Sequence, residues 1–139
     1  MQRRADVNAE EALRLARMSG GAPGRALALA AAEAIAVDDA ARELLAGLPR
    51  PDPGLALSLA DRFRGAEGQA QFNLLFERLA ERVRDHAEQR AGEGSRALDR
   101  WAQAWETLQR LPREVEALNL DRTDALYTAL AELRQAAQA

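Results

Sequence analysis

Both tryptophans of this chain lie on a single apolar stripe, in which large side chains occur at positions i, i+3, i+7 and i+10: Leu98, Trp101, Trp105 and Leu108. This spacing places side chains on one face of an α-helix. The pattern breaks at residues 119–121, and a second stripe of the same kind then begins with Leu126, Leu130 and Leu133. The two stripes predict a helical hairpin, in which the largest side chains of both helices form a structural core.

The composition favours helices along the whole chain. Of the 139 residues, 47% are hydrophobic but only 4% are aromatic, and alanine is the commonest residue type. Alanine and leucine are strong helix formers, and β-branched residues are few. We therefore expect an all-α fold, a helical bundle of about six helices.

Glycine and proline residues mark the ends of the first two expected helices. Residues 8–11 (Asn-Ala-Glu-Glu) resemble a capping box, in which Asn and Glu side chains satisfy free N–H groups at a helix start. The helix that follows stops at the Ser-Gly-Gly of residues 19–21. Proline is favoured at the first helical position, so Pro23 opens a second helix. We expect this helix to run to about Ala46, with Gly47 as a left-handed cap.

Three prolines between residues 48 and 53 exclude a helix in that segment. Asp52 is a suitable N-cap for a third helix, which ends near Gly65. A fourth helix carries a strong apolar stripe over residues 72–83 and ends at the Ala-Gly-Glu-Gly of residues 91–94. The chain is therefore expected to divide at a boundary between Val37 and Pro53.

The helix that carries the tryptophans is expected to begin at Ser95. A proline inside a helix costs about 3 kcal/mol or more, so either this helix ends near Leu111 or one long helix bends at Pro112. We favour the bend, because the apolar residues on both sides of the proline keep the helical period. Asp121 then caps the last helix.

Charge and composition exclude several classes of function. The net charge is −3 with basic and acidic residues interspersed, whereas autonomous binding to nucleic acid needs a concentrated basic face. The absence of cysteine excludes disulfides and thiolate metal sites, and it fits a reducing cytoplasm. No apolar run approaches the ~20 residues that a membrane helix needs. We expect a soluble, cytoplasmic protein that makes no direct contact with nucleic acid or membrane.

No residue pattern in the chain predicts catalysis, a metal site or a cofactor site. His86 is the only histidine and lies among charges, so we expect it to be solvated or salt-paired rather than a ligand. The acidic pairs Glu10–Glu11 and Asp38–Asp39 occupy adjacent helical positions, which do not face each other. We therefore expect solvated or capping roles for these carboxylates.

A glycine-rich segment, residues 19–24, precedes Arg25 at the start of the second helix. A helix N-terminus can bind anions, but this segment lacks the Gly-Lys-Ser/Thr of a phosphate-binding loop and no strand precedes it. A plain loop with a helix start is the favoured interpretation. Arg25 lies in the first turn, where a cation gains nothing from the helix dipole, and this indicates a contact with a partner or another domain.

Three segments together resemble one family. Residues 19–27, Ser-Gly-Gly-Ala-Pro-Gly-Arg-Ala-Leu, resemble the lid-domain segment of delta-prime subunits of the bacterial DNA polymerase III clamp loader. The resemblance continues with Trp101-x-x-x-Trp105 and Leu108, and it closes with residues 117–122, Ala-Leu-Asn-Leu-Asp-Arg. Each motif is short, and their order and spacing are more specific than any one of them.

The resemblance implies that the chain is a C-terminal fragment. Residues 1–40 would be the end of a small helical AAA+ lid domain, and residues 41–139 would be the collar domain through which loader subunits assemble. It implies no nucleotide hydrolysis, no cofactor, and partners among the delta and tau/gamma subunits, which helix faces would contact while the loader places the sliding clamp on DNA. Arg25 occupies the sensor 2 position of AAA+ relatives, and a structural role is expected for it.

Two other function classes remain open at this stage. One is the ligand-binding and dimerising half of a helical transcriptional regulator, with Trp101 and Trp105 lining a pocket. The other is a small all-α hydrolase, which would need a buried cluster of titratable groups with shifted pKa values. The stripe favours core packing of both indoles, and no residue pattern supports the hydrolase.

Overall fold

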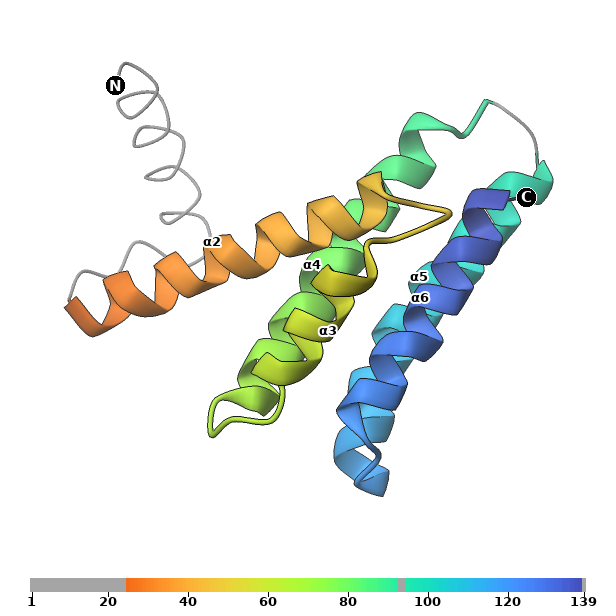
Figure 1. Ribbon diagram of the computed structural model, residues 1–139. Helices are drawn as coiled ribbons and strands as arrows, with labels where there is room; N and C mark the ends of the chain where they lie inside the picture. The colour runs from red at the N-terminus through yellow and green to blue at the C-terminus, as the bar shows by residue number, and fades with distance from the viewer. Residues whose placement is uncertain (1–24, 93–94, 139) are drawn as a thin grey trace, which may run out of the picture.

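The computed structural model describes residues 25–92 and 95–138, which form a compact all-α bundle of five helices with no strand among these residues (Figure 1). The helices are α2 (Arg25–Ala46), α3 (Pro53–Arg62), α4 (Gly68–Gln89), α5 (Ser95–Leu118) and α6 (Arg122–Gln138). The predicted fold class is therefore confirmed. The short helix expected before residue 19, its capping box and the glycine-rich loop of residues 19–24 lie outside the described residues.

Helix α4 is the centre of the bundle. It packs against α2 on one side and α5 on the other, and α6 packs along α5. In Figure 1, α5 and α6 form a hairpin side by side, while α2 runs obliquely across α4 so that its first turns extend beyond the other helices. The short α3 contacts both α2 and α6, so it closes the side of the bundle opposite α5.

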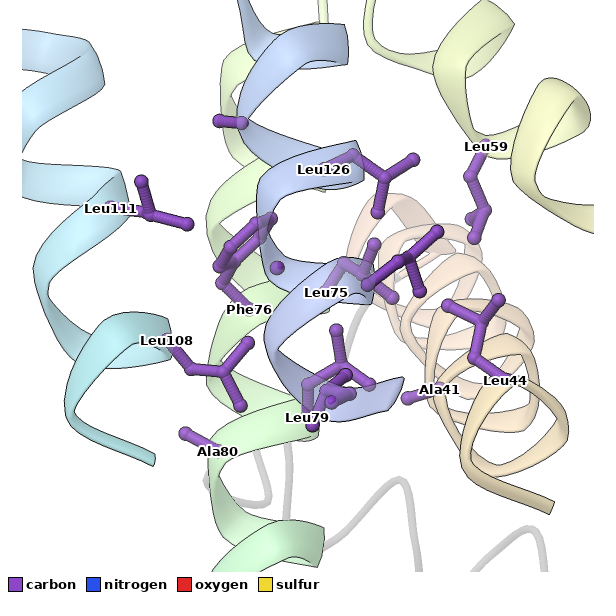
Figure 2. Close-up of a cluster of buried hydrophobic side chains, with 14 of the residues drawn as sticks. Ala41, Leu44, Leu59, Leu75, Phe76, Leu79, Ala80, Leu108, Leu111 and Leu126 are labelled. Carbon is purple, nitrogen blue, oxygen red and sulfur yellow. The ribbon is translucent and has the colours of Figure 1, made fainter. Parts of the chain in front are cut away.

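The core draws apolar side chains from all five described helices. Figure 2 shows Ala41 and Leu44 of α2, Leu59 of α3, Leu75, Phe76 and Leu79 of α4, Leu108 and Leu111 of α5, and Leu126 of α6 pointing toward one another. Phe72 lies beside them, in edge contact with Phe63 at a centroid distance of 5.3 Å. Burying a Leu or Phe side chain contributes about 1.5–3 kcal/mol, and the stripe of α4 supplies five large buried apolar side chains, the most of any described helix.

Two predicted N-caps are present. The Asp52 carboxylate accepts a hydrogen bond of 3.0 Å from the N–H of Gly54, and the Asp121 carboxylate accepts from the N–H of Thr123 at 2.7 Å. Between α5 and α6, Asn119 has a left-handed backbone with φ of 51°, and Leu120 donates its N–H to the carbonyl of Val115 at 3.1 Å. This is the Schellman arrangement that ends a helix.

Gly47 does not form the left-handed cap that the sequence predicts. Its φ lies outside the left-handed region, and its N–H donates to the carbonyl of Glu43 at 3.0 Å. A side chain at Gly47 would instead approach Cα of Pro51, at 3.3 Å from the added Cβ. The glycine is suited to this position because the proline-rich segment folds back against the end of α2.

Two helices continue through residues at which a break was conceivable, α5 through Pro112 and α2 through residues 37–39. Helix α5 continues through Pro112, so the alternative in which it ends near Leu111 is wrong. Helix α2 continues through residues 37–39, because Val37 and Asp38 are buried against the rest of the bundle. The predicted division between residues 40 and 41 therefore lies inside a continuous helix. The division into a lid segment (1–40) and a collar domain (41–139) stays a prediction.

The corner between α3 and α4 is held by Arg122 from the start of α6. Its guanidinium donates hydrogen bonds to the carbonyl of Phe63 and, at 3.2 Å from Nε, to the side-chain oxygen of Gln69. Gly68 lies directly beneath it, and a Cβ there would overlap both the Phe63 carbonyl and Arg122. Gly68 is thus required by a close approach of three segments.

Candidate functional site

A cavity of about 480 Å³ opens at one end of the bundle, where α2, α4 and α6 end and α5 begins. Its polar lining comes mainly from the last turns of α4 and its C-cap, Arg82, Asp85, His86, Gln89 and Arg90, and α2 adds Arg42. Its apolar lining comes from the other elements: Leu45, Leu48, Pro49, Ala97, Trp101 and the alanines at the end of α6. Ligand sites are typically concave, about 300–1,000 Å³, and lined by apolar and aromatic groups with a few polar ones.

The aromatic wall of this cavity is formed by His86 and Trp101. Their ring centroids lie 4.6 Å apart with an interplanar angle of 65°, an edge-on contact between α4 and α5. His86 is half-buried, because α5 passes next to the last turn of α4. This ring contact was not part of the sequence prediction, which placed His86 on the polar side of its helix.

Asp38 does not have the solvated or capping role that the sequence predicted. Its side chain is only 10% exposed and accepts two hydrogen bonds from Arg82, at 3.0 Å from Nε and 2.7 Å from an Nη. Arg78 Nε lies 3.8 Å from the same carboxylate. Adjacent helical positions point in different directions, so Asp38 faces α4 while Asp39 faces the surface and pairs with Arg42 at 3.6 Å.

Arg82 of α4 and Arg42 of α2 therefore have different environments, which the even distribution of charge along the sequence does not separate. Arg82 is fixed by Asp38 and is one-third exposed, so it forms part of the cavity wall with a set position. Arg42 is 60% exposed and only loosely paired. The signal that could have indicated this ion pair is the position of Asp38, which follows Ile35 by three residues and precedes Ala41 by three, so that an acid shares the apolar face of its helix.

The residues predicted to form the core occupy different depths. Trp101, Leu108, Leu126 and Leu130 are buried in the main apolar cluster. Trp105 is partly buried and packs against that cluster. Leu98 is half-buried and lies outside it. Leu98 lies in the first turn of α5, at the open end of the bundle, where fewer helices cover it.

The structure brings Trp101 to the cavity but not Trp105, which is not among the lining residues. Arg25 is the first residue of α2, and its side chain lies outside the described residues. Within the described ranges, no three His, Asp or Glu side chains gather closely enough to hold a metal ion. No helix in the same ranges is long and apolar enough to cross a membrane.

A second surface feature is the turn between α5 and α6. Leu118 is 66% exposed, Leu120 is 42% exposed and Tyr127 is 43% exposed, and all three come from one short stretch of chain. Single exposed leucines are ordinary on protein surfaces, whereas several large apolar side chains close together mark contact sites. We call residues 118, 120 and 127 the α5–α6 turn patch.

Comparisons of the chain with protein-family models, with curated proteins and with solved structures found no match. Functional inference therefore depends on the residues described above and on the resemblance of the three sequence motifs.

Proposed function

We propose that this chain is the C-terminal part of a delta-prime subunit of a DNA polymerase III clamp loader, and that it acts as a non-catalytic assembly domain. In this proposal residues 41–139 form the collar that docks on the delta and tau/gamma subunits, and residues 1–40 are the C-terminal end of the lid domain. The order of the three motifs supports the proposal, and an all-α bundle is the architecture expected for a collar.

The observation that carries the proposal is the division of roles within residues 117–122. Asn119 takes the left-handed conformation that ends α5, Asp121 caps α6, and Arg122 ties α6 to the α3–α4 corner. Structural requirements therefore account for these three residues. They do not account for Leu118 and Leu120, which the same segment holds in solvent.

Two exposed leucines on a rigid, capped turn suit a helix-face contact with another subunit. The capped geometry fixes their positions before binding, so little conformational entropy is lost when a partner covers them. Tyr127, which is 43% exposed on α6, adds an aromatic side chain, a type enriched at protein interfaces. A subunit that assembles without chemistry of its own needs a surface of this kind.

The test is size-exclusion chromatography of the full 139-residue chain mixed with the collar regions of the tau/gamma and delta subunits, at concentrations on the order of tens of micromolar. We expect co-elution. The double variant Leu118→Gln/Leu120→Gln should lose it while retaining the helical circular-dichroism spectrum. Leu57→Gln is the matched control, because Leu57 is 60% exposed but lies on α3. Absence of co-elution for the unaltered chain would overturn the proposal.

The regulator hypothesis has weaker support. It required both indoles to line a pocket, and only Trp101 does so. It also predicts a dimer of this chain alone, so sedimentation of the isolated chain as a monomer would remove it.

A further inference from the structure

We propose that the cavity beside Trp101 is a binding site for a small organic anion with a planar apolar body, such as an aryl carboxylate or sulfonate. The inference concerns the open end of the bundle, not the α5–α6 turn patch, and it stands independently of the assembly role. It rests on the size of the cavity, the aromatic and cationic side chains in its lining, and the fixed position of one arginine.

The cavity has the size of a ligand site, and its lining includes an aromatic pair beside polar and charged side chains. Its volume is about 480 Å³, within the range of about 300–1,000 Å³ found for small-molecule pockets. The Trp101 indole and the His86 ring meet edge-on, and the side chains of Leu45 and Leu48 lie in the same lining. A flat apolar group can pack against this wall and displace water from it.

The ionic groups in the lining indicate that the ligand carries a negative charge. Three arginines (Arg42, Arg82 and Arg90) share the lining with one carboxylate, that of Asp85. The C-terminal ends of α2, α4 and α6 contribute partial negative charge at this end of the bundle, and the start of α5 contributes partial positive charge. The acids that pair with Arg82 and Arg42 lie outside the lining. Among the side chains that a ligand would meet, arginines outnumber carboxylates by three to one, which favours an anion over a cation.

Arg82 gives the site a cation whose position is set before any ligand arrives. Asp38 holds it through Nε and one Nη, which uses two of the five N–H donors of a guanidinium. Arg42 adds a cation that can move, since its pair with Asp39 is 3.6 Å long and its side chain is 60% exposed. A carboxylate or sulfonate bound between them would gain charge-assisted hydrogen bonds.

The test uses anilinonaphthalene sulfonate, an aromatic sulfonate whose emission rises in an apolar site, with the full chain carrying Trp105→Phe so that Trp101 is the sole indole. We expect saturable one-to-one binding, with energy transfer from Trp101 to the dye and competition by naphthoate. Arg42→Glu combined with Arg90→Glu should weaken binding roughly a hundredfold, since each lost charge-assisted contact is worth roughly a factor of ten. Arg84→Glu is the matched control on α4, because Arg84 is 69% exposed and not part of the lining.

A steric variant separates the cavity from general surface binding. Ala137→Phe places a large side chain in the lining from an exposed position of α6 and should abolish dye binding, while Ala131→Phe, exposed on the same helix outside the lining, should not. Equal binding by these two variants, or equal binding by the Arg84→Glu and Arg42→Glu/Arg90→Glu proteins, would refute the site. Binding of a glutamate-rich peptide but of neither aromatic anion would also refute it, because the surface would then be a peptide-docking site.

Discussion

Replacing Asp38 by asparagine tests the buried ion pair between α2 and α4. The substitution keeps the shape of the side chain but removes its charge from beside two arginines, Arg82 and Arg78, whose side chains are 33% and 16% exposed. It also points an amide N–H₂ at a guanidinium, where one of the two hydrogen bonds from Arg82 loses its acceptor. The stability of the contact between these two helices should therefore fall.

The magnitude follows from the geometry. Hydrogen bonds to charged groups contribute about 1.5–3 kcal/mol each, and breaking a fully buried pair costs about 3–5 kcal/mol. Arg82 is one-third exposed, so water can compensate for part of the loss. We expect the free energy of unfolding to fall by about 2–3 kcal/mol, which for a domain of this size lowers Tm by roughly 8–15 °C.

Urea unfolding followed by circular dichroism measures this change, and the slope of the free energy against urea concentration should stay constant because the surface exposed on unfolding is unchanged. Asp39→Asn is the control: Asp39 is the next residue, its side chain is 39% exposed, and its pair with Arg42 lies on the surface. Its substitution should cost less than about 0.5 kcal/mol. If the two variants differ by less than about 0.5 kcal/mol, the assignment of a stabilising buried pair is wrong.

Four other substitutions test the helix ends and the core. Gly68→Ala should destabilise the fold by about 1–3 kcal/mol, because the new methyl group would overlap the Phe63 carbonyl; an unchanged Tm would contradict this packing. Asp121→Ala should cost about 1 kcal/mol through loss of the cap of α6, seen as a lower urea midpoint, and no shift would mean that the cap is dispensable. Leu108→Ala should cost about 2–5 kcal/mol and Leu98→Ala clearly less, since Leu98 is only half-buried; equal losses in thermal melts would show that the whole stripe is buried alike.

Much of the fold could be predicted because it depends on neighbours in the sequence. A capping aspartate acts within three residues, so Asp52 and Asp121 could be placed without knowledge of the rest of the chain. The apolar period of residues 72–83 likewise depends only on the helix repeat, and every large apolar member on its inner face is buried. The helical hairpin of α5 and α6 follows from two such stripes joined by a short break.

The candidate sites were less predictable, because they depend on where one helix stops relative to another. The partner of Asp38 is 44 positions away in the sequence, and only the crossing of α2 over α4 brings the two together. Trp101 borders a cavity while Trp105 does not, although both belong to the same stripe. The reason is that the ends of three other helices leave space beside the first turns of α5.

The sequence alone thus determined the helices, most of their ends and the faces that are apolar, because helix periodicity, capping and proline exclusion act over a few residues. Only the tertiary structure decided how deeply each apolar face is covered, which arginine meets the buried acid, and that a cavity with a cationic wall opens at one end. These properties depend on helix lengths and crossing directions, which are set by packing among residues distant in the chain.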